Sequence, residues 1–265
     1  MAKPGAIRSR LQKMWNAVLP EAVRERNAQR LRLEQFRVQF DAFSRMQREA
    51  GREMELQWQD RLPCLDDATG NTPFDKHYLF HLAWAARIVA ETRPKRHIDV
   101  SSALHFACIV SAFVPTEYYE LRPVALGLDG LATAAADLVC LPFADRSIGS
   151  VSCMHVVEHV GLGRYGDRLD PVSDLNAMSE LKRVLAPGGN LLFVVPVGKP
   201  RVQFNAHRVY AFEQVMECFS GLELVEFALI TDQEHPAGLV RHAPAALVAS
   251  QKYGCGCFWF RRSAA

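Results

Sequence analysis

One short apolar segment and the polar residues behind it set the strongest limit on how this chain can fold. Residues 148–154 alternate apolar and small side chains, which is typical of a strand buried in a parallel sheet. His155, Glu158 and His159 follow this strand directly. In open α/β sheets, ligands bind beyond the carboxyl ends of the strands. The stretch from Asp137 to Val160 is therefore the first candidate for a binding site.

Strands and helices alternate along the chain from Phe74 onward. We expect helices over residues 74–92, 104–113 and 174–185, and strands over residues 96–100, 118–121, 148–154 and 190–196. This order predicts βαβ units, and hence an α/β fold with a mostly parallel twisted sheet and helices on both faces. The segment Cys255-Gly256-Cys257 is too short and lacks partners for a zinc site, so we expect it to lie in the last edge strand.

The first part of the chain has a different character. Residues 6 to about 58 are expected to be helical, with Pro20 in the first turn of a second helix. A ragged apolar stripe runs among arginines at Leu31, Phe36, Phe40 and Phe43. Residues 1–52 carry twelve Lys and Arg against five acids, which gives 12 − 5 = +7, so the remainder carries 2 − 7 = −5. We therefore expect a basic helical extension over residues 1–60, a linker over 61–73 and an α/β domain over 74–265.

Three interpretations of the basic extension stay open. It could pack on the domain or on the second subunit of a homodimer, it could contact an anionic membrane or a protein partner, or it could be disordered. The total charge of +2 does not favour nucleic acid as a partner. Seven scattered cysteines and no apolar run of about 18 residues favour a reduced protein in the cytoplasm.

Two motifs in the α/β part are similar to those of a known superfamily. The stretch from Leu141 to His159 fits LPFxDxSIxxVxxxHVxEH, and LKRVLAPGGNLLFVVP follows at residues 181–196. Together they resemble the class I S-adenosylmethionine-dependent methyltransferases, which have a Rossmann-like fold. More narrowly, HVVEHVGLGRYGDRLDP and FNAHRVY look like the family catalogued as DUF268, whose members are often encoded beside enzymes of surface polysaccharide synthesis. The resemblance covers about residues 74–257.

This resemblance implies S-adenosylmethionine as the cofactor and assigns residues to it. Asp99, Ser101 and Ser102 would lie beside its amino-acid part, and Glu120 would accept hydrogen bonds from both ribose hydroxyls. Asp137 and Leu138 would hold the adenine. Ser101 stands where the superfamily usually has glycine, and we expect a serine here to cap the helix that follows. For Glu120, the alternative is a surface acid paired with Arg122.

His155, Glu158 and His159 are the candidate catalytic residues. Four residues apart, the two histidines are expected to share one helix face, with one of them as the general base and Glu158 as an orienting group. Alternatively, the histidines could belong to an ordinary strand-to-helix junction and bond only to the backbone. A metal site is the third interpretation, and it would need Asp167, Asp170 or His207 as a further ligand. We predict no metal ion.

Two further segments supply candidate substrate residues. The glycine-bearing loop at 161–171 offers an aromatic ring and carboxylates that suit a sugar, and the segment around His207 is expected over the same sheet edge. The candidates are Arg164, Tyr165, Asp167, Asp170, Asn205, His207 and Arg208.

The sequence thus predicts methyl transfer to a sugar or glycan hydroxyl in surface polysaccharide synthesis. The alternative is a protein of the same fold that performs no chemistry and acts as a binding partner. The turn from Val100 to Leu104, which has no glycine, favours that alternative, whereas the polar residues at every strand end favour the enzyme. Methylation of nucleic acid is a distant third.

Overall fold

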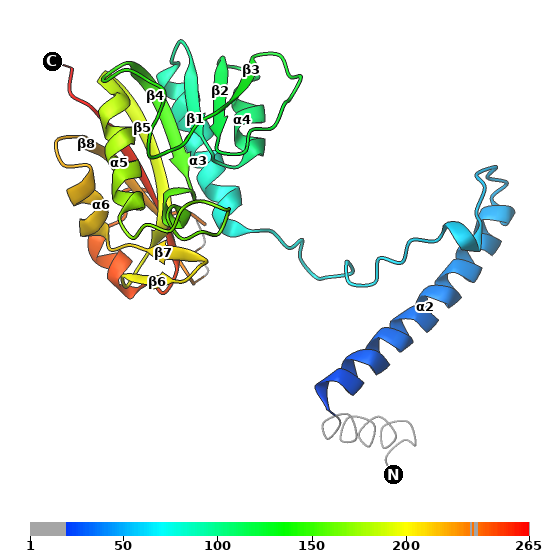
Figure 1. The fold of residues 1–265 in the computed structure, drawn as a ribbon. Helices are drawn as coiled ribbons and strands as arrows, with labels where there is room; N and C mark the ends of the chain where they lie inside the picture. Colours follow the sequence, from blue (N-terminus) through cyan, green and yellow to red (C-terminus); the bar gives the residue numbers. More distant parts are fainter. Residues whose placement is uncertain (1–19, 234, 236–237, 265) are drawn as a thin grey trace. The chain divides into compact units, whose positions relative to one another are not determined.

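A computed structural model describes residues 20–233, 235 and 238–264 and divides the chain into two units, Met1–Pro73 and Phe74–Ala265. In the first unit, helix α2 (Glu21–Glu49) begins directly after Pro20 (Figure 1). It ends nine residues earlier than predicted, because Gly51 takes a left-handed conformation with φ 63° and turns the chain away. The expected helix before Pro20 lies outside the described residues.

None of the residues of α2 is buried, and two of its aromatic side chains lie against one tryptophan of the same unit. Trp58 lies in a short 3₁₀ turn, η1 (Trp58–Asp60), with its ring centroid 6.0 Å from that of Phe36 and 4.9 Å from that of Phe40. The guanidinium groups of Arg37 and Arg61 lie 4.0 and 4.4 Å from the Trp58 ring centroid. Part of the apolar stripe of α2 therefore has a local partner, whereas Leu31 and Phe43 stay exposed.

The second unit is built on a seven-stranded sheet in the part of the chain that the structure describes (Figure 1). Its strands are β1 (His97–Val100), β2 (Thr116–Glu120), β3 (Leu131–Ala135), β4 (Ile148–Met154), β5 (Leu185–Val197), β8 (Glu223–Ile230) and β9 (Gly254–Arg261). The spatial order is β3-β2-β1-β4-β5-β9-β8. Neighbours from β3 to β5 are parallel, and β9 is antiparallel to both β5 and β8. The predicted α/β class with a mostly parallel sheet is confirmed.

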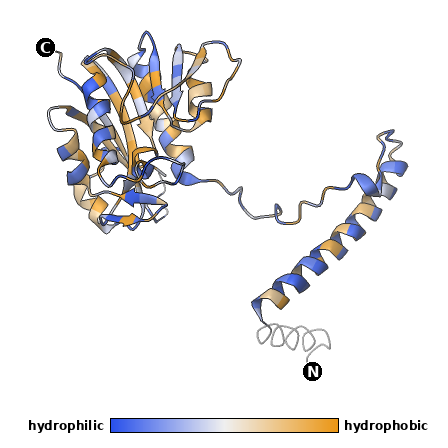
Figure 2. Cartoon of the chain, in the orientation of Figure 1, coloured by the Kyte–Doolittle hydropathy of each residue, from blue (hydrophilic) through white to orange (hydrophobic). Residues whose placement is uncertain are grey.

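Helices cover both faces of this sheet, as predicted. Helices α3 (Lys76–Thr92) and α4 (Leu104–Val110) pack on one face, and α5 (Ser173–Val184) and α6 (Phe212–Cys218) pack on the other. Strand β5 shows the alternation, because Leu191 and Phe193 belong to the core beneath α5 and α6, while Leu192 and Val194 belong to the core beneath α3 and α4. Strand β5 is accordingly hydrophobic over Leu191–Val195 (Figure 2), whereas β1 and β4 also bury the polar residues His97, Asp99, Ser150 and Ser152.

Several elements differ from the sequence prediction, which gave no element for the segments of β6 (Arg201–Gln203), β7 (His207–Val209), α6 and β8. Strand β3 was not predicted, because its sequence LATAA is short and rich in alanine, which has a low strand propensity. Helix α4 ends at Val110 and not at Phe113. The segment containing Cys255 and Cys257 does form a strand, but β9 lies inside the sheet and β8 is at the edge.

The shorter elements lie near the carboxyl ends of the parallel strands. A single 3₁₀ turn, η2 (Val157–His159), follows β4, and an antiparallel hairpin joins β6 (Arg201–Gln203) to β7 (His207–Val209). A second 3₁₀ segment, η3 (Ala245–Ser250), precedes β9. Among the described residues, no helix is both long enough and apolar enough to cross a membrane.

Candidate functional site

A cavity of about 270 Å³ lies beyond the carboxyl ends of the parallel strands, and we call it the main cavity. Four strand ends contribute to its wall: Ser101–Ala103 after β1, Glu120–Arg122 at the end of β2, Ala136–Leu138 after β3 and Met154–Val156 after β4. Here β1 pairs with β2 on one side and β4 on the other, so the chain changes direction across the sheet. A crevice at such a switch point is where open α/β sheets bind ligands.

Glu120 faces the main cavity with both carboxylate oxygens only weakly occupied. Its Oε1 accepts the Arg122 backbone N–H at 3.4 Å, and its Oε2 accepts the Tyr118 hydroxyl at 3.5 Å. The Arg122 guanidinium lies 5.0 Å from the centroid of the Tyr165 ring. The carboxylate of Glu120 can therefore accept further hydroxyl donors from a ligand in the cavity.

Ser101 and Ser102 both line the main cavity, but neither caps α4, whose N-cap is Ala103 without a side-chain bond. Ser101 adopts a left-handed conformation with φ 58°, and its hydroxyl donates to the Tyr119 carbonyl oxygen at 3.2 Å. The Ser102 hydroxyl accepts the Met154 N–H at 3.0 Å. The expected cap is wrong, because each hydroxyl is used to join neighbouring strands.

Asp99 lies in the core and not on the wall of the cavity. Its side chain is fully buried, its Oδ1 accepts the Ser152 hydroxyl at 2.6 Å, and its Oδ2 has no partner among the described residues. Since the Ser152 hydroxyl donates to Asp99, its oxygen accepts from His97 Nε2 at 2.9 Å. Burial raises the pKa of Asp99 to about 7 and lowers the pKa of His97 to about 3. This strand-end acid thus joins a buried polar chain.

Asp137 and Leu138 both line the main cavity. Asp137 Oδ1 accepts the Val139 N–H at 3.1 Å, which folds the backbone into a tight turn. Leu138 is buried and supplies an apolar part of the wall. A flat aromatic ligand could pack on it.

The three candidate catalytic residues lie together, although not on a helix face. His155 is left-handed with φ 56°, and η2 makes only one 3₁₀ turn, so the predicted helical spacing is wrong. Glu158 Oε1 lies 2.8 Å from His155 Nδ1 and 3.9 Å from His159 Nε2. Burial raises the pKa of Glu158 to about 7 and lowers that of His155 to about 4, so both groups favour their uncharged forms.

The two histidines differ in what their nitrogens contact. His155 is buried, with Nδ1 at Glu158 and Nε2 lying 3.4 Å from Cys255 Sγ. His159 is half-buried, and its Nδ1–H donates to the Ala206 carbonyl oxygen at 2.6 Å, which leaves Nε2 as the unprotonated nitrogen. Burial lowers the pKa of His159. The neutral form of His159 is therefore favoured, and its Nε2 is available as a proton acceptor.

A second hollow of about 300 Å³ adjoins the main cavity, and we call it the histidine hollow. It shares Tyr78, His155, His159 and Tyr165 with the main cavity. Its remaining wall includes His77, His207 and Tyr253. The sequence prediction missed Tyr78, His77 and Tyr253, although histidines four residues apart at 77 and 81 already marked one face of the first helix of the domain.

The predicted substrate residues divide into two groups. Arg164, Tyr165 and His207 line the histidine hollow. The other four have different surroundings. Asp167 borders the main cavity, but its carboxylate accepts the N–H groups of Gly161, Gly163 and Tyr165 at 2.7, 3.3 and 3.2 Å.

Asp170, Asn205 and Arg208 do not reach either hollow. Asp170 accepts the Val172 N–H at 3.0 Å and the Ser173 hydroxyl at 2.8 Å, so it organises the start of α5. Asn205 is exposed in the turn between β6 and β7. Arg208 is buried, donates to the Val160 carbonyl oxygen at 2.6 Å and has its Nε 3.5 Å from an Asp174 oxygen. Its guanidinium is therefore engaged inside the protein and not at either hollow.

Comparison with solved structures defines the fold. N-methyltransferase NodS from Bradyrhizobium japonicum WM9 in complex with S-adenosyl-L-homocysteine has a TM-score of 0.50 at 16% identity, over 70% of this chain and 87% of that one. A second NodS structure gives a TM-score of 0.51 at 15% identity over 71% and 98% of the two chains. A putative sarcosine dimethylglycine methyltransferase from Galdieria sulphuraria gives 0.50 at 16% identity over 70% and 86%. The α/β domain therefore has the Rossmann-like methyltransferase fold.

A narrower match comes from the sequence. Residues 144–250 match the family described as "Caenorhabditis protein of unknown function, DUF268". This confirms the predicted DUF268 resemblance over the segment that contains β4, His155, Glu158 and the loop after them. No curated protein matches the sequence.

Proposed function

We propose that this protein is an S-adenosylmethionine-dependent methyltransferase whose acceptor is a hydroxyl of a sugar or glycan. The observation that carries the proposal is Glu120, an acid at the end of β2 with two underused oxygens on the wall of the main cavity. These two acceptor oxygens suit the two hydroxyl donors of a ribose. Leu138 and Asp137, placed beside it, fit an adenine ring and its amino group.

Bound S-adenosylmethionine would supply a methyl group on a positively charged sulfur. The chain's own residues would bind and orient the acceptor in the adjoining histidine hollow. Tyr78 and Tyr165, each more than 40% exposed, offer aromatic faces on which a sugar ring can pack. His159 Nε2 would accept the acceptor's hydroxyl proton, because its Nδ1–H is held by Ala206. His155 is a poorer base, since both its nitrogens already face protein groups.

Calorimetric titration with S-adenosylhomocysteine tests the proposal. We expect the wild-type chain to bind one equivalent, and we expect Glu120→Ala to weaken binding at least tenfold. Glu117→Ala is the matched control, because Glu117 lies on the same strand but pairs with Arg96 at 2.8 Å outside the main cavity. Equal loss in both variants, or no loss in either, would contradict the role of Glu120.

A second function has its own support. This is a protein of the same fold that binds a partner and catalyses no reaction. Two features favour it: Ser101 is left-handed in the turn from Val100 to Leu104, and Asp99, just before this turn, points into the core. The variant Ser101→Gly separates the two functions, because glycine adopts this φ freely and removes the side chain from the cavity wall. Binding of S-adenosylhomocysteine by the variant alone would mean that Ser101 closes the site in the wild-type chain.

A further inference from the structure

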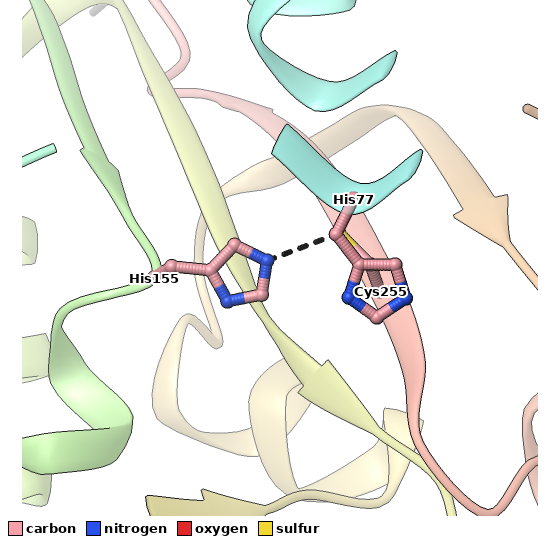
Figure 3. A group of neighbouring side chains, drawn as sticks. All are labelled: His77, His155 and Cys255. Carbon is pink, nitrogen blue, oxygen red and sulfur yellow. Dashed lines mark hydrogen bonds between the residues drawn. The ribbon is translucent and has the colours of Figure 1, made fainter. Parts of the chain in front are cut away.

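We propose that His77, His155 and Cys255 bind a zinc ion at the inner wall of the histidine hollow. The three side chains come from α3, from the turn after β4 and from β9, and they converge in the core (Figure 3). One ligand atom from each, two imidazole nitrogens and one sulfur, lies within 4.8 Å of the other two. All three residues are buried.

The spacing of one pair already matches zinc coordination. His155 Nε2 and Cys255 Sγ are 3.4 Å apart, as the dashed line in Figure 3 marks. Around a tetrahedral zinc ion with Zn–S of about 2.3 Å and Zn–N of about 2.0–2.1 Å, a nitrogen and a sulfur lie roughly 3.5 Å apart. Imidazole and thiolate together favour zinc over magnesium or calcium. Binding would deprotonate the Cys255 thiol and release its proton to solvent.

Glu158 supplies the outer contact that metal-binding histidines usually have. Its Oε1 lies 2.8 Å from His155 Nδ1, so the Nδ1–H donates to the carboxyl group and Nε2 keeps its lone pair toward Cys255. Glu158 is buried, and its Oε2 has no hydrogen-bond partner among the described residues. A nearby cation would compensate the cost of burying this carboxylate.

Three protein ligands leave one position of a tetrahedral ion open. His77 and His155 both line the histidine hollow, so a water molecule or a hydroxyl group could reach the ion from there. Zinc binding requires neither cofactor binding nor methyl transfer. Failure of the proposed function would therefore leave this inference intact, and the reverse also holds.

Titration of the metal-free full-length chain with Co²⁺ tests the site, because cobalt bound to a thiolate gives a charge-transfer absorption band in the near ultraviolet. We expect one equivalent to bind, Zn²⁺ to displace it, and Cys255→Ser to remove the band. His77→Ala should weaken binding further than Glu158→Gln, for which we expect a loss of about 10–100-fold with the band retained. Cys153→Ala is the control, since Cys153 is an equally buried thiol on β4 outside the group.

Circular dichroism of each variant verifies that it folds, and X-ray absorption of the zinc-loaded wild-type chain requires no variant. That spectrum should contain one sulfur at about 2.3 Å and nitrogen neighbours at about 2.0–2.1 Å. A zinc shell without sulfur would overturn the proposal. A cobalt band that persists in Cys255→Ser, or that disappears in Cys153→Ala, would overturn it as well.

Discussion

At the scale of single residues, the strand ends of this domain carry polar side chains with two different uses. Glu120 is directed to the main cavity, whereas Asp99, at the end of the neighbouring strand, is enclosed by the core. The difference follows from the contacts, because the Ser152 hydroxyl holds Asp99 inward at 2.6 Å. A polar residue at a strand end therefore need not contact a ligand, since its side chain can instead form hydrogen bonds with polar groups inside the sheet.

Asp99 should make stability depend on pH. Its pKa is about 7 in the folded chain and near 3.8 when the chain is unfolded, so folding favours the protonated form. Its contribution is fully present below about pH 4 and is lost as the pH rises to about 7. We expect the free energy of unfolding of the wild-type chain, relative to Asp99→Asn, to fall by on the order of 2–4 kcal/mol between these limits.

Urea unfolding of both chains at several pH values measures this difference. The groups near Asp99 are Ser102, Tyr118 and Glu120, together with His97, which reaches Asp99 indirectly by way of the Ser152 hydroxyl. They are present in both chains, so their own titration largely cancels. A pH-independent difference between the two chains would show that Asp99 is ionised in the folded protein.

At the scale of elements, strand β4 was predicted best, β3 and β8 were not predicted, and β9 was predicted as a strand but at the wrong place in the sheet. Residues 148–154 were predicted to the residue, because a buried strand bounded by polar residues has a strong pattern. Strand β3 has only a weak strand pattern in its sequence, because its residues are mostly exposed and rich in alanine. The interior place of β9 depends on pairing with both β5 and β8, which local sequence cannot specify.

The same limit applies to the candidate site. His155, Glu158 and His159 were predicted together because they are adjacent in sequence, and they do lie together. Cys255, 100 residues after His155, was assigned to structure alone, and His77 was not singled out. Contacts between separate elements bring His77 to the histidine hollow and Cys255 to His155, and a periodicity argument for one element at a time does not reveal them.

The loop over residues 161–170 depends on one carboxylate. Asp167 accepts three backbone N–H groups, and although burial alone would raise its pKa, these donors lower it. We expect Asp167→Ala to destabilise the protein by about 1–3 kcal/mol, because the donors lose their acceptor. Trypsin should then cut faster after Arg164 and Arg168, which lie in this loop.

Timed digestion of the folded protein measures this effect. Asp129→Ala, an exposed acid in the turn before β3, is the control and should digest like the wild-type chain. If Asp167→Ala is cleaved no faster than the control, the loop is held by its glycines and by Tyr165 instead. Gly161 has φ 79° and approaches the Asp170 carbonyl oxygen so closely that no side chain fits there.

At the scale of the whole molecule, the α/β domain contains its own core. Every buried apolar residue of the described chain lies after Pro73, and α2 buries none of its side chains. We expect a chain of residues 72–265, which keeps the Asp75 cap of α3, to unfold cooperatively within about 4 °C of the full-length protein, equivalent to about 1 kcal/mol. Thermal circular dichroism compares the two chains, and a loss of cooperative unfolding would show that the first unit is needed for the core.

The interior position of β9 has a consequence for how the protein is made. The ribosome produces β5 and β8 before β9, yet in the finished sheet β9 separates them and pairs with both. Until residues 254–261 have left the exit tunnel, each of those strands keeps an unpaired edge exposed to other chains. The strand that closes this gap also carries Cys255, so the same late step brings this thiol beside His77 and His155.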